Sequence, residues 1–317
     1  MNVAVIGATG FIGSALLRTL ASNVRHDVVG FSRDKNHALP TNVRHTIIGD
    51  IAVQADFVSK LQGIDVVLHA VARAHIMNDK AADPLAEFRH VNVLGTLNLA
   101  RQAAEAGVGR FLFISSIKVN GEQTAPGQFF TADDSPAPED PYGISKWEAE
   151  QGLLQIGRET GMEVVIIRPP LVYGPGVKGN FANMIKLLEK GLPLPLGAIH
   201  NKRSLVALDN LVGLINTCID HPAAVDQVFL AGEGEDLSTS DLLRLVAVAM
   251  GKPSRLVPMP VGILQFGATL LGKQAMAKRL LGSLQVDISK TRELLDWTPP
   301  LSVHEGLKCC FKNIQKH

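Results

Sequence analysis

The feature that most constrains the fold of this chain is the alternation of short apolar runs with longer segments of helical periodicity. Runs rich in Val, Ile and Leu recur at residues 2–7, 28–31, 45–49, 65–72, 110–115, 164–168 and 228–231. Several are almost continuously apolar, as strands are when helices cover both faces of a parallel sheet. The stretches between them, at 11–22, 84–106 and 145–160, have the spacing of helices. The sequence therefore predicts an α/β fold with a doubly wound parallel sheet.

The pattern changes after residue 168, where Pro and Gly gather between positions 169 and 179. These residues interrupt regular elements, so the segment predicts a junction between two parts of the chain. Beyond it we expect an extended connector at 192–197 and a mostly helical region from residue 239, and we expect further helices at 183–190 and 206–220. The predicted larger domain is 1–168 plus about 206–231, and the smaller domain is about 169–205 plus 232–317.

Net charge and cysteine usage argue against several classes of protein. The 317 residues carry 31 Lys and Arg against 30 Asp and Glu, so no overall field attracts nucleic acid or an anionic membrane. The three cysteines form no Cys-x-x-Cys pair, which predicts reduced thiols in a cytoplasmic protein and no metal site. We expect no signal peptide, and the most apolar later stretch, 261–272, is too short to span a bilayer.

Three glycines lie between the first predicted strand and the first predicted helix, as Gly7-Ala-Thr-Gly10-Phe11-Ile12-Gly13. Glycine permits a tight turn and the close approach of a ligand to backbone amides. Amides at a helix N-terminus bind the pyrophosphate of a dinucleotide. The spacing is Gly-x-x-Gly-x-x-Gly, and the alternative is a chance Gly-rich turn. Its position at the first strand–helix turn favours a dinucleotide cofactor bound beside Phe11 and Ile12.

The end of the second predicted strand bears on the choice between NAD and NADP. An acid there hydrogen-bonds the ribose of NAD, whereas an arginine accommodates the 2′-phosphate of NADP. In this chain Ser32 stands where the acid is expected and Arg33 follows it. We therefore expect NADP. The alternatives are NAD, which Asp34 keeps possible, and a merely solvated Arg33.

Tyr142 and Lys146 are spaced to lie on one face of a helix and so to reach the same bound molecule. A free tyrosine has a pKa near 10, and a neighbouring Lys cation is expected to lower it. Ser116 follows the fifth predicted strand and therefore lies at the edge of the sheet where ligands bind. The Tyr-x-x-x-Lys spacing alone often occurs by chance on a solvated helix. Together with the glycine turn, the three residues predict a catalytic acid–base group.

In combination these motifs resemble the extended short-chain dehydrogenases/reductases, the NAD-dependent epimerase/dehydratase family, over essentially the whole chain. The resemblance implies a Rossmann sheet that binds NADP or NAD, a smaller, mostly helical C-terminal substrate domain, and a nucleotide-sugar substrate. The residues that carry it are Gly7-x-x-Gly10-x-x-Gly13, Asp50-Ile51, His69-Ala70-Val71-Ala72, Val91-Asn92-Val93-x-Gly95-Thr96, Ser115-Ser116, Tyr142-x-x-x-Lys146 and Arg168-Pro169-Pro170-x-Val172-Tyr173-Gly174-Pro175.

The resemblance also implies roles for single residues. Asp50 and Ile51 would hold the adenine, Ala70 and Ala72 would line the cofactor cleft with Asn92, and the catalytic lysine would also bind the nicotinamide ribose.

On the substrate side, the resemblance implies that Asn180, Arg203 and, less directly, Arg279 bind the diphosphate of a UDP-sugar. Arginine suits this role because its guanidinium makes paired hydrogen bonds to phosphate oxygens. Lys118 and His75 are further candidates for substrate contact, and solvated side chains are the alternative for both.

Finer resemblance points to bacterial O-antigen enzymes that reduce a UDP-4-keto-6-deoxy-N-acetylhexosamine to UDP-N-acetylquinovosamine, in lipopolysaccharide biosynthesis. The 4,6-dehydratases carry an Asp-Glu pair after the catalytic serine or threonine, where this chain has Ile117 and Lys118. Because isoleucine transfers no proton, a dehydratase is not expected. The alternatives are a UDP-hexose 4-epimerase with tightly bound NAD, and a non-catalytic NADP-sensing protein. The family usually forms homodimers through its two long helices, here about 84–106 and 145–160.

Overall fold

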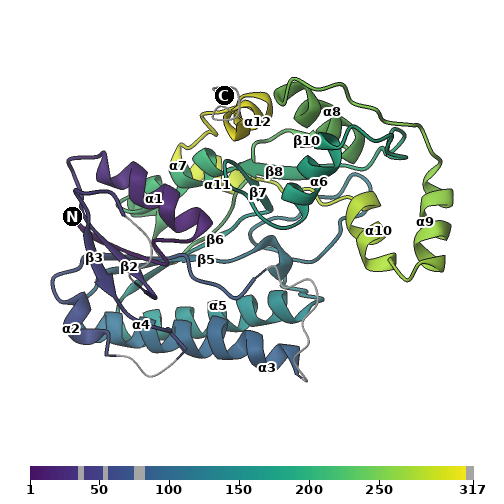
Figure 1. The fold of residues 1–317 in the computed structure, drawn as a ribbon. Helices are drawn as coiled ribbons and strands as arrows, with labels where there is room; N and C mark the ends of the chain where they lie inside the picture. The colour runs from purple at the N-terminus through teal and green to yellow at the C-terminus, as the bar shows by residue number, and fades with distance from the viewer. Residues whose placement is uncertain (35–38, 53–55, 75–82, 312–317) are drawn as a thin grey trace.

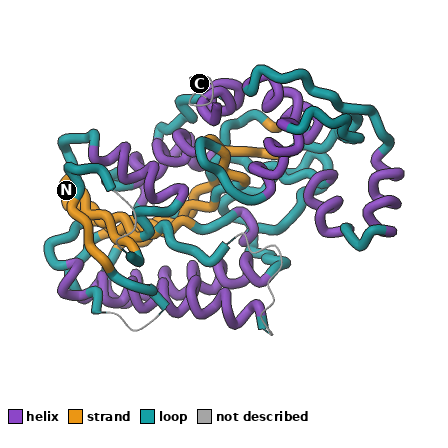
Figure 2. The backbone as a smooth tube through the Cα atoms, viewed as in Figure 1, coloured by secondary structure: helices purple, strands orange, loops and turns teal. Residues whose placement is uncertain are grey.

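The central sheet has seven parallel strands in the order β3-β2-β1-β4-β5-β6-β9, in a computed structural model that describes residues 1–34, 39–52, 56–74 and 83–311 (Figures 1 and 2). The order reverses between β1 and β4, which is where doubly wound sheets bind their ligands. The predicted doubly wound parallel sheet is confirmed. Its strands are β1 (Asn2–Ile6), β2 (Asp27–Ser32), β3 (Arg44–Ile47), β4 (Val66–His69), β5 (Arg110–Ile114), β6 (Glu163–Arg168) and β9 (Val228–Leu230).

Helices cover both faces of this sheet, which explains the nearly continuous apolar strands. On one face lie α1 (Phe11–Ala21) and α7 (Leu208–Cys218), and on the other lie α4 (Thr96–Glu105) and α5 (Pro141–Thr160) (Figure 1). Successive side chains of a strand point to opposite faces. Val3 and Val5 of β1 therefore enter the core under α1 and α7, while Ala4 and Ile6 enter the core under α4 and α5.

The helix expected over 84–106 is interrupted. The chain forms α3 (Pro84–Arg89), a π-helical segment (His90–Gly95) and then α4. A Cβ on Gly95 would lie 2.9 Å from the Ile51 side chain and 3.1 Å from its carbonyl oxygen, so the wide turn presses the backbone against that residue. π-helical turns are frequent at functional sites, and this one carries the buried side chain of Asn92.

Helix α5 begins earlier than the expected residue 145. Asp140 precedes it, and its carboxylate accepts a hydrogen bond of 2.7 Å from the Gly143 amide, as a helix cap does. The helix ends at Gly161, whose φ of +78° suits glycine. Tyr142 therefore lies in the first turn of the helix, close to its capping carboxylate.

A second sheet of three strands has the order β10-β8-β7 and was not expected from the sequence. Its strands are β7 (Leu171–Tyr173), β8 (Arg203–Ala207) and β10 (Asp236–Leu237). The helix expected over 206–220 is wrong at its start, because Val206 and Ala207 pair with Val172 and Tyr173 of β7.

Two of the remaining helices, α2 and α11, pack beside the central sheet, and the others cover this second sheet or extend beyond it. Helices α6, α8 and α12 contribute to one apolar core with β7 and β8. None of the helices in the described ranges has both the length and the apolar character needed to cross a membrane. The helices not yet placed are α2 (Val58–Leu61), α6 (Asn180–Glu189), α8 (Thr239–Ala249), α9 (Val261–Leu270), α10 (Gln274–Leu281), α11 (Ser289–Leu295) and α12 (Val303–Phe311).

Candidate active site

The glycine turn connects β1 to α1 in a conformation that larger residues disfavour. Gly7 has a φ of +86°, and its amide donates a 3.0 Å hydrogen bond to the carbonyl of Phe31 at the end of β2. A Cβ on Gly13 would collide with the Gly7 carbonyl group. The glycines therefore let the start of α1 pack directly on the end of β1, as the sequence predicted.

The first turn of α1 fits a dinucleotide pyrophosphate. Gly10 precedes the helix, and no side chain of the described residues caps it. The amides of Phe11, Ile12 and Gly13 have no partner within the helix, because they belong to its first turn. They are thus available to an anion, and the positive end of the helix dipole adds to the attraction.

At the end of β2, Ser32 and Arg33 point into different surroundings. The Ser32 hydroxyl is buried, donates to the Asp34 carbonyl at 2.7 Å and lies 2.6 Å from His45 Nε2. The Arg33 side chain is 77% exposed, and its Nε lies 4.0 Å from the Asp34 carboxylate. Arg33 is therefore the more accessible of the two cofactor candidates.

The residues expected to hold the adenine follow β3, and those expected to line the cofactor cleft with Asn92 follow β4. Asp50 is exposed and accepts a 3.0 Å hydrogen bond from the Ala52 amide, whereas Ile51 is buried. Ala70 is half-buried and continues the pairing of β4 with β1, since its amide donates to Ile6 at 2.9 Å.

Ala72 is exposed and lies just beyond this pairing. The turn at Gly7 packs against the same segment, because a Cβ there would lie 2.8 Å from a Val71 methyl group. His75, a candidate for substrate contact, lies outside the described residues.

Asn92 joins the segment after β4 to α5. Its side-chain oxygen accepts a 2.8 Å hydrogen bond from the Arg73 amide, and its side-chain nitrogen donates to Ser145 Oγ at 3.0 Å. Ser145 in turn donates to the Tyr142 carbonyl at 2.8 Å. Asn92 was expected to bind the cofactor, and its hydrogen bonds join the two segments that carry Arg73 and Ser145. The sequence reasoning missed Ser145, which lies inside the Tyr-x-x-x-Lys motif.

The structure brings Ser116, Tyr142 and Lys146 together. The Ser116 side chain hydrogen-bonds the Tyr142 phenol, and the phenol ring meets Phe88 edge-on at 6.0 Å. Lys146 is buried, and its ammonium group donates to the Ile114 carbonyl at 2.8 Å. Hydroxyl, phenol and ammonium thus gather where β5 ends and α5 begins.

The pKa values of the tyrosine and lysine differ from the expectation. Removal from water and the charge of Asp140 raise the pKa of Tyr142 to about 12, although the Ser116 hydrogen bond works in the opposite direction. Burial lowers the pKa of Lys146 to about 7, and the charge of Glu150 opposes that fall. The pKa of Tyr142 therefore lies above its ordinary value of 10, whereas the sequence analysis expected a lowered value, and the phenol is a neutral acid near pH 7.

A buried carboxylate behind Lys146 was missed. Glu150 lies one helical turn after Lys146. Its carboxylate accepts hydrogen bonds from the Ser115 hydroxyl and from Nε and Nη2 of Arg168. Arg168 also donates to Asn120 Oδ1 at 3.0 Å. The four-residue spacing from Tyr142 through Lys146 to Glu150 was the available signal, because such residues share one helix face.

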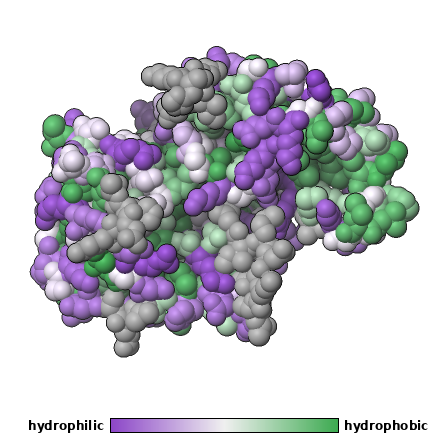
Figure 3. Space-filling view, viewed as in Figure 1, coloured by the Kyte–Doolittle hydropathy of each residue, from purple (hydrophilic) through white to green (hydrophobic). Residues whose placement is uncertain are grey.

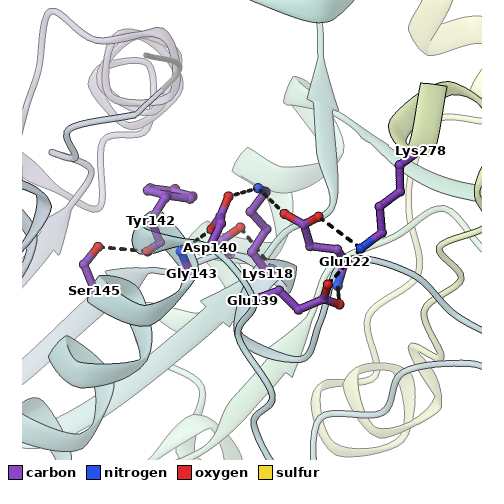
Figure 4. A network of polar contacts seen from close by, with 9 residues as sticks. Lys118, Glu122, Glu139, Asp140, Tyr142, Gly143, Ser145 and Lys278 are labelled. Atoms are coloured by element: carbon purple, nitrogen blue, oxygen red, sulfur yellow. Dashed lines mark hydrogen bonds and ion pairs between the residues drawn. The ribbon is translucent and has the colours of Figure 1, made fainter. Parts of the chain in front are cut away.

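Lys118 belongs to a chain of ion pairs shown in Figure 4. Its ammonium contacts the capping carboxylate Asp140 and lies 3.0 Å from Glu122. Lys278 of α10 extends the chain, at 2.8 Å from Glu139 and 3.9 Å from Glu122. Lys118 was expected to contact substrate, and it partly neutralises the charge next to Tyr142.

Two of the expected diphosphate residues lie together. Arg203 starts β8, is half-buried and donates to the carbonyls of Arg279 at 3.0 Å and Gly282 at 3.1 Å. The Arg279 side chain is exposed. Asn180 is the exposed first residue of α6, and no contact recorded among the described residues joins it to the two arginines.

Comparison with known proteins identifies the family. Residues 3–232 match the model of the NAD dependent epimerase/dehydratase family. The UDP-glucose 4-epimerase of Vibrio cholerae is 47% identical over 317 aligned positions, which cover 97% of this chain and 93% of that protein.

Two solved structures share the fold. The UDP-glucose 4-epimerase of Thermotoga maritima with UDP-glucose has a TM-score of 0.80 at 24% identity, covering 100% of this chain and 99% of that one. The UDP-glucuronic acid 4-epimerase of Bacillus cereus in complex with NAD has a TM-score of 0.78 at 22% identity, with the same coverage. By its family match and by the identity with the Vibrio cholerae protein, the chain belongs to the NAD dependent epimerase/dehydratase family.

Proposed function

We propose that the protein is a NAD-dependent 4-epimerase of a UDP-hexose or a UDP-N-acetylhexosamine. The observation that carries the proposal is the 47% identity with a UDP-glucose 4-epimerase across 97% of the chain. The retained Ser116, Tyr142 and Lys146 support an enzyme rather than a cofactor sensor. A dehydratase is disfavoured, because Ile117 cannot transfer a proton and the Lys118 ammonium is paired with Asp140.

In this proposal the cofactor rests on the glycine turn, with its pyrophosphate on the amides of residues 11–13 and its nicotinamide ribose at Lys146. When bound, NAD supplies a reversible hydride acceptor for carbon 4 of the sugar. Tyr142 holds and returns the proton of the 4-oxygen, and Ser116 hydrogen-bonds that same oxygen. Because its pKa is about 12, Tyr142 is ready to donate to a 4-keto oxygen and needs added positive charge nearby to accept a proton.

The remaining assignments follow from this proposal. Residues 1–168 with about 206–231 bind the cofactor, and about 169–205 with 232–317 bind the nucleotide sugar through Asn180, Arg203 and Arg279. We also propose a cytoplasmic homodimer formed through the long helices. Leu94, 61% exposed, and Trp147, 36% exposed, lie on these helices and support this interface. Sedimentation velocity of the wild type and of Leu94→Glu measures it.

The second candidate is the NADPH-dependent 4-ketoreductase of a UDP-4-keto-6-deoxy-N-acetylhexosamine, with a place in O-antigen synthesis. The observation that favours it is the end of β2, where the acid expected for NAD is replaced by the buried Ser32 and the exposed Arg33. The neutral phenol of Tyr142 also suits the protonation of a ketone, which is the direction a reductase needs.

Two measurements separate the candidates. The purified protein is denatured and the released nucleotide identified, and the native protein is incubated with UDP-glucose or UDP-N-acetylglucosamine without added cofactor. If the protein is a 4-epimerase, the denatured sample releases NAD, and the native protein inverts carbon 4 of at least one of the two UDP-sugars. If neither UDP-sugar is inverted at carbon 4, and a UDP-4-keto-6-deoxy sugar oxidises NADPH, the protein is the reductase. In that case Arg33→Ala should raise the Michaelis constant for NADPH more than about tenfold, since a charged hydrogen bond contributes roughly 1.5–3 kcal/mol.

A further inference from the structure

The hairpin of α9 and α10 exposes its apolar residues instead of burying them. Ile263, Phe266 and Leu270 are 56%, 67% and 72% exposed, and their spacing places them on one face of α9. Leu271 and Met276 continue this apolar face at 71% and 50% exposure. No residue of α9 is buried. The hairpin projects from the body of the molecule, and hydrophobic side chains gather over it (Figures 1 and 3).

The polar side of the hairpin faces the body. Gln265 and Thr269 of α9, Lys278 of α10 and Gln123 line a cavity of about 310 Å³. Gln123 donates to the Lys278 carbonyl at 2.9 Å, and the Lys278 ammonium pairs with Glu139 at 2.8 Å. A surface helix of a globular protein normally turns its apolar stripe inward and its polar face to water. In this hairpin the polar side contacts the rest of the protein through Lys278, and the apolar side is exposed to solvent.

The segment that contains the hairpin carries cations and no acidic residue, although acids outside it pair with two of these cations: Lys278 with Glu139 and Arg244 with Asp241. The sequence has no Asp or Glu from residue 242 to residue 286, and its cations there are Arg244, Lys252, Arg255, Lys273, Lys278 and Arg279. The exposed Lys273 lies in the turn between the two helices, next to Leu271. We expected no membrane partner from the net charge of +1 for the whole chain. That total does not reveal the excess of cations in this segment.

We propose that this hairpin docks the protein on the surface of an anionic lipid bilayer. Exposed Phe and Leu on one side and flanking cations are the combination that buries an apolar face at the headgroup boundary and attracts acidic phospholipids. A second copy of the chain fits less well, because a symmetric contact between two hairpins would bring their cations together. This inference goes beyond the proposed 4-epimerase activity and does not depend on it.

The test is co-sedimentation of the full-length protein with phosphatidylcholine vesicles that contain or lack phosphatidylglycerol. We expect binding only to the anionic vesicles, weakened by salt. The double variant Phe266→Gln/Leu270→Gln should lower the partition coefficient at least about tenfold, because it removes two apolar side chains from the docking face. Lys273→Glu should lower it about fivefold. Val248→Gln, at a position on α8 that is 62% exposed, is the matched control and should bind as the wild type does.

A spectroscopic variant makes the contact directly visible. The fluorescence of Phe266→Trp should shift to shorter wavelength with anionic vesicles and stay unchanged with neutral ones. Thermal melting checks that all variants are folded. Absence of vesicle binding, or equal binding by the double variant, would overturn the proposal. Self-association of the wild type that the double variant abolishes, without vesicle binding, would instead make this face an interface between copies.

Discussion

Glu150 and Arg168 form an ion pair that is buried between α5 and the end of β6. The carboxylate accepts from Arg168 Nη2 at 2.6 Å and from Nε at 3.0 Å, and the two side chains are 1% and 4% exposed. Lys146 lies one turn earlier on the same helix, and its pKa responds to the Glu150 charge. The pair therefore links the position of α5, and of Lys146 on it, to the central sheet.

We predict that Glu150→Ala destabilises the fold by about 3–5 kcal/mol, because it leaves the Arg168 guanidinium buried without its counter-charge. Urea unfolding measures the loss. Glu148→Ala is the matched control on the same helix, since its 2.5 Å pair with Arg89 is reached by solvent, with the two side chains 27% and 47% exposed, and its loss should cost much less stability. Equal losses for the two variants would refute the assigned importance of burial.

Tyr142→Phe should reduce turnover by about 10²–10⁴-fold, because it removes the group that holds the proton of the 4-oxygen and keeps the ring beside Phe88. Single-turnover kinetics with the nucleotide sugar measure the effect. Tyr173→Phe alters the only other tyrosine of the sequence, whose buried hydroxyl donates to Glu233. It should lower the melting temperature and leave turnover at low temperature nearly intact. Wild-type turnover by Tyr142→Phe would remove Tyr142 from the chemistry.

Arg203→Ala should weaken the binding of free UDP about tenfold or more in calorimetry, because charged hydrogen bonds to phosphate are lost. Arg279→Ala keeps the backbone carbonyl that accepts a hydrogen bond from Arg203. Weaker UDP binding by this variant would therefore be due to the missing Arg279 guanidinium. Arg244→Ala, which breaks an exposed pair with Asp241, is the control. Unchanged UDP affinity in Arg203→Ala would place the diphosphate elsewhere, and intact NAD binding shows that the variant is folded.

Glu233→Gln should remove a pH dependence of stability. Burial raises the pKa of Glu233 from 4.5 to about 7, so the folded state binds an extra proton between these values. The stability that this proton confers is complete below pH 4.5 and is lost as the pH rises through 7. A glutamine stays neutral, and its amide can donate to Tyr173, whose hydroxyl also reaches the Val303 carbonyl.

We therefore expect Glu233→Gln to unfold at higher urea concentration than the wild type at pH 8, by roughly 1–3 kcal/mol, and to match it near pH 4.5. Urea unfolding at the two pH values measures this difference. Parallel pH curves for the two proteins would contradict the raised pKa.

Features whose physical cause is local were predictable from the amino-acid sequence. A short, nearly continuous apolar run between helical segments is typical of a strand covered on both faces, so the central sheet was predictable from the sequence pattern. The glycine turn was predictable because a Cβ on Gly13 collides with the neighbouring Gly7 carbonyl whatever the rest of the chain does. Tyr142 and Lys146 were predictable as a pair because one helix carries both.

Features that depend on partners far away in the sequence became visible only in the folded protein. Residues 203–207 form a strand because β7 and β10 pair with them. Their apolar side chains alone would fit a buried helix as well as a strand. The direction of the Tyr142 pKa was wrong in the sequence analysis because desolvation and the Asp140 charge outweigh any help from Lys146. Glu150 meets Arg168 only because β6 returns beside α5. Burial and long-range pairing, which set these outcomes, arise only when the chain has folded.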